Sequence, residues 1–474
     1  MSHLTIAEVY QKARELIQKL NQLEEKKNQA LKELAETEIE VRGWVKSVRF
    51  QSKIFIALND GSCLQNLQIV CSLSLLEKAK SANFGSCLTA KGKLELTSER
   101  AQICELQAKE IIVSPVASGY PLQKNKIPLD VVRNYPHLRA KTNYFLVLFR
   151  LRHSISKAIH DFFHQERFYY ISTPIITSND TEGAGETFNV TTNEIQSTAG
   201  DQKEPFFSKP AKLTVSGQLQ AEALAQGLGK VYTFSPCFRA EKSHTARHLA
   251  EFWMVEPEMA FTNLVEIIDL AEKMVKYVIN FVLDNNNAEL KFLENYDKEN
   301  KKEIISKLKN IATNYFKRIN YTQAIEILKV SQENFVFNDI KWGMDLQSEH
   351  EKYLCNHFDK PVFITNYPMD LKAFYMKNNL DGKTIDCFDL LFPEVGELIG
   401  GSMREDNYNI LREKAQKTKL DTNNLSWYFD LRKYGYAPSG GFGLGLERLL
   451  MFLTDTKNIR DVVPFPRYPQ HLEC

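Results

Sequence analysis

The spacing of apolar and polar positions changes several times along the chain and divides it into segments. In residues 4–35 apolar side chains recur at alternating spacings of three and four, which is a heptad seam and predicts one long helix. Its polar positions carry both signs of charge, so a coiled coil or a docking helix is favoured over a basic helix that grips nucleic acid. The seam comprises Ile6, Val9, Ala13, Leu16, Leu20, Leu23, Lys27, Ala30 and Leu34.

From Glu38 onward the apolar residues alternate with polar ones, as in strands that have one face buried. Turn residues separate the runs, for example Asn59-Asp60-Gly61-Ser62. Five such runs within about 75 residues predict a five-stranded oligonucleotide-binding (OB-fold) β-barrel over residues 37–115, preceded by a helical N-terminal extension over 1–36. The runs read IEVRGWVKSV, KIFIALND, LQNLQIVCSL, SCLTAKGKLEL and AQICELQAKEIIVS.

The first two predicted strands mix cations with aromatic residues. Single-stranded RNA is bound by this combination, because aromatic rings stack on bases and cations pair with phosphates. The alternative is that the aromatic residues, Trp44 and Phe55 above all, simply fill the barrel core. The set comprises Arg42, Trp44, Lys46, Arg49, Phe50, Lys53 and Phe55.

After the barrel, the pattern indicates a linker and then a large α+β domain. Residues 116–142 hold three prolines and little periodicity, which is typical of a hinge linker. A long amphipathic helix from about residue 144 to 165 opens the next domain, 143–474, and strand-like runs follow it. A helical insertion is expected at about 263–330, where Gly and Pro are absent. Strands that do not alternate one-to-one with helices predict an antiparallel or mixed sheet flanked by helices.

Charge and cysteine content narrow the setting in which such a protein works. The 60 basic and 59 acidic residues nearly cancel, but residues 1–150 hold 22 basic and 15 acidic side chains, against 38 and 44 in the remainder. The barrel half therefore suits a phosphate backbone. Eight scattered cysteines without a C-x-x-C pair give neither a disulfide framework nor a zinc site. No apolar run is long enough to span a membrane and no secretory signal is present, so we expect a cytoplasmic protein with no membrane partner.

Two runs in the large domain suggest nucleotide chemistry. Phe238-Arg239-Ala240-Glu241, a polar loop and His248-Leu-Ala-Glu-Phe252 form a candidate hairpin in which Arg239 could bind a phosphate and Phe252 could stack on a base. The run Gly440–Arg448, GGFGLGLER, bares one face of a strand before a helix. Its spacing excludes a Rossmann turn. Taken singly, the first is more often a surface pair and the second is more often close packing.

A third run, FDLLFPEVGELIGGSMRE, places two carboxylates beside a glycine pair. Asp389 and Glu397 could together hold Mg²⁺ against nucleotide phosphates. Paired acids are usually solvated, so this pair alone carries little weight. The three runs are specific because they occur together and in this order.

In that order, the runs resemble the class II aminoacyl-tRNA synthetases of the aspartyl, asparaginyl and lysyl subgroup. Motif 1 corresponds to the helix and strand ending at Pro174, motif 2 to FRAE…HLAEF and motif 3 to GFGLGLERL. The resemblance covers nearly the whole chain from about Glu38 and includes the anticodon-binding barrel. It implies a class II catalytic domain with an antiparallel sheet, and a homodimer formed through the motif 1 region.

Within that subgroup the asparaginyl-tRNA synthetases are the most similar. Ser216-Gly217-Gln218-Leu219-Gln220-Ala221 has alanine where the aspartyl family has a lysine for the substrate carboxylate, and Thr181–Glu186 lacks that family's arginine. The resemblance implies activation of L-asparagine with ATP to asparaginyl-adenylate and pyrophosphate, followed by transfer to the 3′ end of tRNA(Asn). An aspartyl-tRNA synthetase or a non-discriminating relative stays the nearest alternative. An asparagine synthetase of the same fold, which would lack the barrel, and an inactive RNA-binding paralogue are more distant ones.

The resemblance also implies roles for individual residues. Glu182, Ser216 and Gln218 are expected to bind the substrate's ammonium group. Arg404 and Glu256 are expected to hold the side-chain amide, which needs one donor and one acceptor. Asp389 and Glu397 are expected to bind Mg²⁺. The anticodon readers are expected to be Arg49, Phe55 and Gln68. The expected ATP-binding residues are Arg239, Glu241, Arg247, His248, Phe252, Glu397, Gly445 and Arg448, and the catalytic ones among them are Arg239, Glu241 and Arg448.

Overall fold

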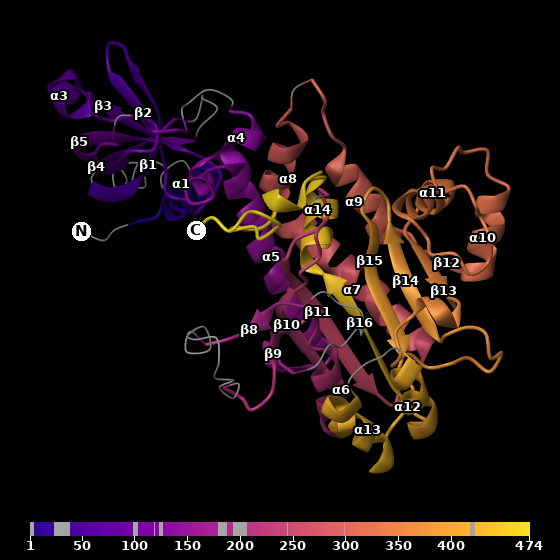
Figure 1. Cartoon of the computed structure of the whole chain (residues 1–474). Helices are drawn as coiled ribbons and strands as arrows, with labels where there is room; N and C mark the ends of the chain where they lie inside the picture. The colour runs from indigo at the N-terminus through magenta and orange to yellow at the C-terminus, as the bar shows by residue number, and fades with distance from the viewer. Residues whose placement is uncertain are drawn as a thin grey trace. The chain divides into compact units, whose positions relative to one another are not determined.

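The computed structural model divides the chain into two compact units, Met1–Val147 and Leu148–Cys474 (Figure 1). Each is described by itself. In the part of the chain that the structure describes, no helix is both long and apolar enough to cross a membrane. The described residues are 4–22, 38–97, 103–117, 119–122, 127–178, 187–192, 206–243, 245–297, 299–417 and 422–474.

The first unit contains a closed five-stranded barrel with the strand order β1-β2-β3-β5-β4, which confirms the predicted OB-type barrel. The alternation of buried and exposed positions along the strands closes the barrel around its core. In β4, for example, residues 88, 90, 92 and 94 are buried while their neighbours are not. Short helical segments η1 (Leu73–Leu75) and α3 (Leu76–Ala79) follow β3. The strands are β1 (Glu38–Phe50), β2 (Ile54–Asn59), β3 (Leu67–Cys71), β4 (Cys87–Leu96) and β5 (Cys104–Ser114).

The N-terminal helix α1 (Ile6–Gln22) docks on this barrel. Ile6, Val9 and Ala13, the first three residues of the heptad seam, are fully buried in the same apolar cluster as the barrel strands. The amide of Ile6 donates to Asp60 Oδ2 at 2.7 Å, and Tyr10 Oη donates to the carbonyl of Asn66 at 2.9 Å. The docking interpretation therefore holds for the described half of the helix. The rest of the expected helix, 23–35, lies outside the described residues.

The expected hinge contains ordered structure where it is described. It includes α4 (Leu129–Arg133) and the short turn η2 (Arg139–Lys141). Arg139 is fully buried, with its guanidinium 4.8 Å from the centre of the Phe145 ring. Lys46 of β1 donates to the carbonyl of Lys141 at 2.7 Å, and burial, followed by the nearby Lys141, lowers its pKa to about 8. Lys46 is thus held by this segment, unlike the exposed Arg49.

The second unit is built on an eight-stranded sheet with the order β12-β13-β14-β15-β16-β11-β10-β6. The two outermost pairs, β12·β13 and β10·β6, are parallel and the inner pairs are antiparallel, as the sequence predicts for an antiparallel or mixed sheet. The strands are β6 (Tyr169–Tyr170), β10 (Lys230–Phe238), β11 (Glu251–Ala260), β12 (Lys317–Asn320), β13 (Val362–Thr365), β14 (Cys387–Phe392), β15 (Gly396–Met403) and β16 (Ser439–Gly445).

Helices flank this sheet, and a small second sheet lies beside it. The small sheet has the strand order β7-β9-β8, formed by Ile176–Thr177, Ala211–Leu213 and Asn189–Val190. The helices are α5 (Asn143–Gln165), α6 (Gln218–Leu228), α7 (Leu264–Asn285), α8 (Asn287–Glu294), α9 (Ile304–Thr313), α10 (Tyr321–Lys329), α11 (Ser348–Phe358), α12 (Tyr408–Lys417), α13 (Ser426–Lys433) and α14 (Leu446–Thr454), with the turns η4 (Met369–Leu371), η5 (Thr422–Leu425) and η6 (Ile459–Asp461).

The segment expected to be a helical insertion also supplies an edge strand. Helix α7 begins at a capping box, in which Asn263 accepts from the Glu266 amide and Glu266 accepts from the Asn263 amide. Between α9 and α10, β12 pairs in parallel with β13. Its sequence is Lys-Arg-Ile-Asn, and a single apolar residue gives no alternation from which a strand could be predicted.

Candidate active site

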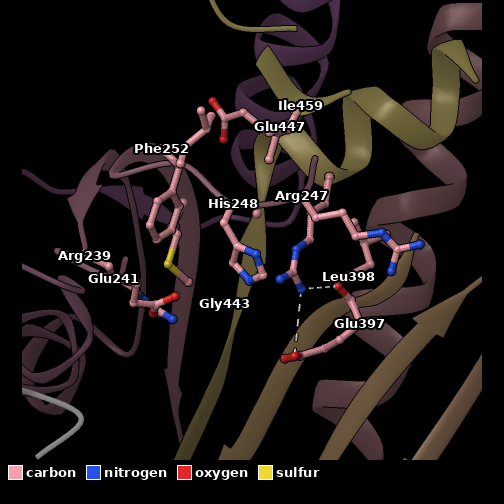
Figure 2. A pocket seen from close by; sticks show the side chains of 14 residues that line it. Arg239, Glu241, Arg247, His248, Phe252, Glu397, Leu398, Gly443, Glu447 and Ile459 are labelled. Atoms are coloured by element: carbon pink, nitrogen blue, oxygen red, sulfur yellow. Dashed lines mark hydrogen bonds and ion pairs between the residues drawn. The ribbon is translucent and has the colours of Figure 1, made fainter. Parts of the chain in front are cut away.

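A cavity in the second unit gathers every residue expected to bind ATP (Figure 2). They come from strands that are neighbours in the sheet, because β11 pairs with both β10 and β16, and β16 pairs with β15. The antiparallel order brings together segments that lie far apart in the sequence. The lining residues are Arg239, Glu241, Arg247, His248, Leu249, Phe252, Met254, Glu397, Leu398, Gly443, Gly445, Glu447, Arg448 and Ile459.

Three arginines supply the positive charge of this cavity. The guanidinium of Arg239 lies 5.3 Å from the centre of the Phe252 ring, close enough for a cation–π contact. Arg448 Nη1 donates to the carbonyl oxygen of Glu397 at 2.6 Å, and its distance to Glu397 Oε2 is 3.9 Å. Arg247 Nη2 donates to the carbonyl of Glu394 at 2.5 Å. Arg247 and Arg448 donate to backbone oxygens, and the nearest carboxylate oxygen of Glu397 stands 3.9 Å from Arg448, so these guanidinium groups can still bind an anionic ligand.

The cations of the cavity act on one another. Burial lowers the pKa of Arg247, and the nearby Arg448 lowers it further. Burial, followed by Arg448, likewise lowers the pKa of His248, whose Nδ1 lies 2.5 Å from Thr245 Oγ1. A polyanion such as a triphosphate would relieve this mutual repulsion. The cavity therefore has the electrostatics of a phosphate site.

The glycines of β16 serve both packing and the cavity, so both interpretations of the glycine-rich strand apply. A Cβ at Gly441 would lie 2.1 Å from the carbonyl oxygen of Pro257, so β11 packs too closely for any side chain there. Gly443 and Gly445 line the cavity instead. A Cβ at Gly443 would meet only Met254 Cε, at 2.5 Å, so this glycine leaves room inside the cavity.

The two carboxylates expected to hold Mg²⁺ flank Gly400. A Cβ built there would lie 2.9 Å from Glu397 Oε1 and 3.6 Å from Asp389 Oδ1. Asp389 is held by Lys372, whose Nζ lies 2.8 Å from Oδ1 and 2.7 Å from Oδ2. Burial raises the pKa of Asp389, an effect that Lys372 opposes and Glu397 reinforces. Glu397 lines the cavity and is half-exposed.

Within the described ranges no group of three or more His, Cys, Asp and Glu side chains could hold a metal ion by itself. Mg²⁺ bound to a nucleotide takes one or two carboxylates and completes its shell with phosphate oxygens and water. Two adjacent carboxylates at the edge of a phosphate-type cavity therefore fit such an ion. Asp389 would have to share its oxygens with Lys372.

A third carboxylate, which the sequence analysis did not single out, adjoins this pair. Glu351 of α11 accepts from the amide of Glu397 at 3.3 Å, and a Cβ at Gly396 would lie 2.5 Å from its Oε2. Burial first, then the like charges of Glu397 and Asp389, raise the pKa of Glu351 to about 7. Nothing in the run SEHEKYL distinguishes Glu351 from its acidic neighbours, so sequence offered no signal for it.

The start of α6 gathers the residues expected around the amino-acid substrate. Ser216 Oγ donates to Glu256 Oε1, and the amide of Gly217 donates to Glu256 Oε2 at 3.0 Å. The amide of Gln218 donates to Ser216 Oγ at 3.1 Å. Gln218 Nε2 is buried and has no hydrogen-bond partner within the described residues. A buried orphan donor is costly, so this amide is prepared for a ligand. Glu182 lies outside the described residues.

Arg404 is paired with Glu258, which the sequence analysis also missed. Its Nε donates to Glu258 Oε2 at 3.2 Å, its Nη2 donates to Oε1, and its Nη1 donates to Ser402 Oγ at 2.7 Å. Both side chains are buried, 2% and 0% exposed. Burial acts to lower the pKa of Arg404, but Glu258 raises it well above its usual range. The sequence could have indicated Glu258, because Glu256 and Glu258 are charged residues on one face of the otherwise apolar run FWMVEPEMAF.

On the barrel, the three expected anticodon readers form one patch. Arg49 and Phe55 are cross-strand partners, with the guanidinium 5.8 Å from the ring centre. Arg49 Nη2 donates to Gln68 Oε1 at 3.1 Å, and Gln68 Nε2 donates to Glu105 Oε1 at 2.8 Å. Trp44 is 40% exposed, so it does not fill the barrel core.

A second, more apolar cavity of about 650 Å³ adjoins the first, and Glu241 lines both. Its walls come from the end of β10, the start of β11, the small sheet and the C-terminal segment. Tyr468 and His471 stack there with ring centres 4.4 Å apart. This arrangement offers aromatic surface next to the cation-rich cavity.

Comparisons with known proteins agree with one another. The family model of class II tRNA synthetases (D, K and N) matches residues 129–469. The asparagine–tRNA ligase of Cytophaga hutchinsonii is 46% identical over 92% of this chain and 96% of its own length. That of Mycoplasma mycoides is 49% identical over 93% and 97%. The crystal structure of asparaginyl-tRNA synthetase from Pyrococcus horikoshii complexed with asparaginyl-adenylate superposes with a TM-score of 0.83, at 30% identity over 94% of this chain and 98% of that one.

Proposed function

The chain belongs to the class II tRNA synthetases (D, K and N), as an asparagine–tRNA ligase, and from that premise we propose how its residues perform the reaction. The asparagine carboxylate attacks the α-phosphorus of ATP, pyrophosphate leaves, and the adenylate passes its acyl group to the 3′-terminal ribose of tRNA(Asn). No protein nucleophile takes part, so the residues act by positioning the reactants and neutralising charge.

ATP occupies the cavity between β11, β16 and α14. Arg239 bridges the α-phosphate and the substrate carboxylate, while Phe252 and Arg448 enclose the adenine. Arg247 and His248 meet the outer phosphates. The observation that carries this proposal is the meeting of all the expected ATP-binding residues in one cavity, three of them arginines. The guanidinium of Arg239 lies 5.3 Å from the centre of the Phe252 ring, so the group that binds the phosphate and the ring that stacks on adenine are neighbours.

Glu397 and Asp389, which flank Gly400, would hold Mg²⁺. When bound, it neutralises phosphate charge. Glu397 orients Arg448 as well, since its carbonyl accepts from Nη1 at 2.6 Å. Lys372 keeps Asp389 in place and compensates its buried charge.

The substrate amide lies at Arg404, which donates to the amide oxygen. Of the two glutamates on β11, Glu258 contacts Arg404, whereas both oxygens of Glu256 are engaged by Ser216 and Gly217. We keep the acceptor for the amide nitrogen at Glu256, whose carboxylate also fixes the α6 N-terminus, and give Glu258 the role of holding Arg404. Ser216 and Gln218, with Glu182, hold the α-ammonium and carboxylate end.

The tRNA approaches from the second cavity. Glu241 lines that cavity and the ATP cavity alike, so it can contact the adenine amine on one side and the acceptor end on the other.

On the barrel, Phe55 stacks on an anticodon base and Arg49 pairs with its phosphate. Phe55→Ala should therefore raise the KM for tRNA about 10-fold or more and leave tRNA-independent pyrophosphate exchange unchanged. An unchanged KM would remove Phe55 from the anticodon site.

The enzyme works as a homodimer through the motif 1 region. Strand β6 is an edge strand of the large sheet, and its residues Tyr169 and Tyr170 are 60% and 53% exposed. Exposed edges with large apolar side chains are normally covered. The molar mass in solution tests this, and Ile176→Asp in the adjacent β7 should shift it toward the monomer. Its site of action is the cytoplasm, where translation consumes the product and where cysteine thiols stay reduced.

The decisive experiment compares asparagine and aspartate in ATP–pyrophosphate exchange, followed by charging of tRNA transcripts that carry each anticodon. Exchange with asparagine and charging of tRNA(Asn) alone is expected. Equal exchange with aspartate would replace the amide-selective assignment by a non-discriminating one.

A further inference from the structure

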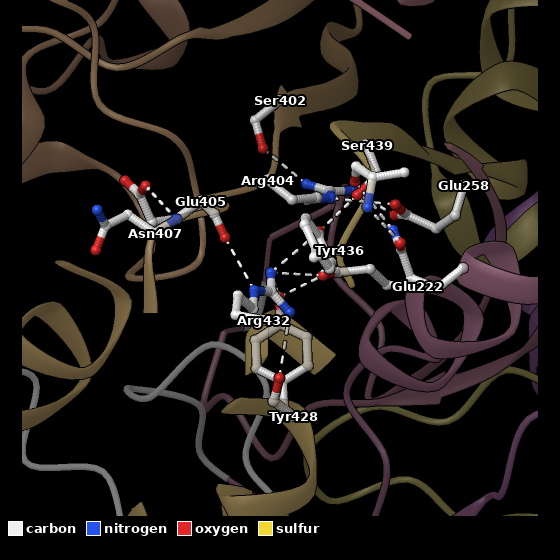
Figure 3. Close-up of polar contacts among 12 residues, drawn as sticks. Glu222, Glu258, Ser402, Arg404, Glu405, Asn407, Tyr428, Arg432, Tyr436 and Ser439 are labelled. Carbon is white, nitrogen blue, oxygen red and sulfur yellow. Dashed lines mark hydrogen bonds and ion pairs between the residues drawn. The ribbon is translucent and has the colours of Figure 1, made fainter. Parts of the chain in front are cut away.

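Behind Arg404 lies a second buried ion pair, between Glu222 of α6 and Arg432 of α13 (Figure 3). Arg432 Nη2 lies 2.6 Å from Glu222 Oε1, and both side chains are fully buried. Tyr428 Oη donates to Glu222 Oε2 and Tyr436 Oη donates to Oε1, each at 2.6 Å. The guanidinium is enclosed by the two rings, 4.2 and 4.1 Å from their centres. Glu222 is thus a carboxylate with three donors.

Hydrogen bonds connect this ion pair to the backbone next to Arg404 on two sides. Arg432 Nε donates to the carbonyl of Glu405 at 2.9 Å. Tyr436 Oη lies 2.5 Å from Ser439 Oγ, and the carbonyl of Ser439 accepts from the amide of Arg404 at 2.8 Å. A change at Glu222 would therefore reach the Arg404 guanidinium without contacting the substrate.

The charges of the two pairs also balance. Arg404 is matched by Glu258 and Arg432 by Glu222, and the buried carboxylate of Glu256 lies close to this group, so within the described residues both of these arginines are paired. Burial acts to lower the pKa of Arg404, while the carboxylates of Glu258 and Glu222 raise it. An amide enters this pocket without adding charge. A carboxylate of the same shape would be buried with nothing to compensate it, which costs several kcal/mol.

We propose that Glu222, held by Arg432, Tyr428 and Tyr436, is a positioning residue that sets the preference of the pocket for asparagine over aspartate. It does so by cancelling the charge of Arg432 and by fixing the backbone that carries Arg404. The inference rests on the proposed placement of the substrate amide at Arg404. Buried ion pairs contribute little to stability compared with an apolar replacement, so a stabilising role alone does not account for this one.

The test measures kcat/KM for asparagine and for aspartate in pyrophosphate exchange with the full-length Glu222→Gln enzyme. This substitution keeps the size of the side chain and removes its charge. The ratio of the two kcat/KM values should fall about 10-fold or more, because Arg432 is then free to attract the carboxylate. A purely structural role would lower both values by the same factor and leave the ratio unchanged, which would overturn the proposal.

Two further variants keep the test decisive. Tyr436→Phe removes only the hydroxyl that links Glu222 to Ser439, and should lower the ratio in the same direction by a smaller factor even if Glu222→Gln folds poorly. Glu289→Gln is the matched control, since Glu289 is also buried and ion-paired, to Arg150 at 2.8 Å, and should leave the ratio unchanged. An unchanged ratio in soluble Tyr436→Phe, or a fall in Glu289→Gln as large, would count against the proposal. Wild-type exchange with aspartate as good as with asparagine would instead refute the amide-selective site itself.

Discussion

The ATP cavity and the amide pocket lie in one catalytic unit, but their arginines differ in burial and in how closely a carboxylate pairs with them. Arg448 donates to a backbone carbonyl, and the carboxylate of Glu397 stands 3.9 Å from it; the two side chains are 32% and 44% exposed. Arg404 is buried against Glu258 in a two-point ion pair. The first arrangement keeps positive charge available for a polyanion. The second cancels it, so that only hydrogen-bond geometry is left to recognise a neutral amide. Charge supplies binding in one pocket and is removed for selectivity in the other.

Among the variants that test this contrast, Arg239→Ala should have the largest effect on activity. Arg239 lines the ATP cavity, and in the proposed mechanism it neutralises charge that develops at the α-phosphate. Its loss should reduce asparagine-dependent pyrophosphate exchange about 1,000-fold or more, as for other groups that stabilise a transition-state charge. Arg318→Ala, which removes a part-exposed arginine paired with Asp269 and Glu272, is the control and should stay within about 2-fold of wild type. If Arg239→Ala kept full pyrophosphate exchange, the assignment of the ATP cavity would be wrong.

The amide pocket should respond in stability as well as in activity. Arg404→Ala leaves the Glu258 carboxylate buried without its partner, which costs about 3–5 kcal/mol of unfolding free energy. The double variant Arg404→Met with Glu258→Leu should recover most of that loss in denaturant unfolding and still show no asparagine activation. If the double variant is as unstable as the single one, the pocket is not held by charge balance.

The same contrast explains what the sequence could and could not predict. The barrel was predicted correctly, and the residues predicted to bind ATP meet in one cavity, because each depends on short runs: alternation within strands, FRAE…HLAEF, and GFGLGLER. Their residues are neighbours either in sequence or across adjacent strands. The strand β12 was missed because Lys-Arg-Ile-Asn carries no pattern.

The amide pocket was only partly predicted because its pairs span long sequence distances. Arg404 meets Glu258 across 146 positions, and Tyr428 meets Glu222 across 206. No local pattern can indicate which of two acidic residues on β11, Glu256 or Glu258, faces Arg404. The register of β11 against β16 decides that, and register is a property of the folded sheet. Apolar surroundings could have identified both glutamates as buried but not their partners.

A milder test of the ATP cavity is Arg448→Lys. Lysine keeps the charge but loses the planar group that stacks on a base and donates in a fixed fork. The KM for ATP should rise about 10-fold, while the KM for asparagine changes little. Equal changes in both would mean that Arg448 serves the shape of the cavity and not the nucleotide.

The smallest effect concerns pH and two glutamates on one helix, α11. The pKa of Glu351 is raised from 4.5 to about 7 by burial and then by Glu397 and Asp389. The folded state therefore holds a proton that the unfolded state releases near 4.5, and the stability this group contributes is complete below that pH and is lost as the pH rises through 7. Glu351→Gln cannot lose that proton, so its Tm should exceed the wild-type value by a margin that grows from pH 5 to pH 8.

Glu349, two residues earlier, should behave in the opposite way. It accepts from the amides of Phe337 and Val336 at 2.8 and 2.9 Å, and these bonds lower its pKa. Its contribution is present above its ordinary pKa and is lost as the pH falls, so Glu349→Gln should lower Tm more at pH 8 than at pH 4. Thermal scans of both variants across pH give two slopes of opposite sign. Slopes of the same sign would show that Glu351 is not kept protonated by burial and by its carboxylate neighbours. The charge state of the carboxylates beside the ATP cavity would then differ less from that in the amide pocket than the geometry indicates.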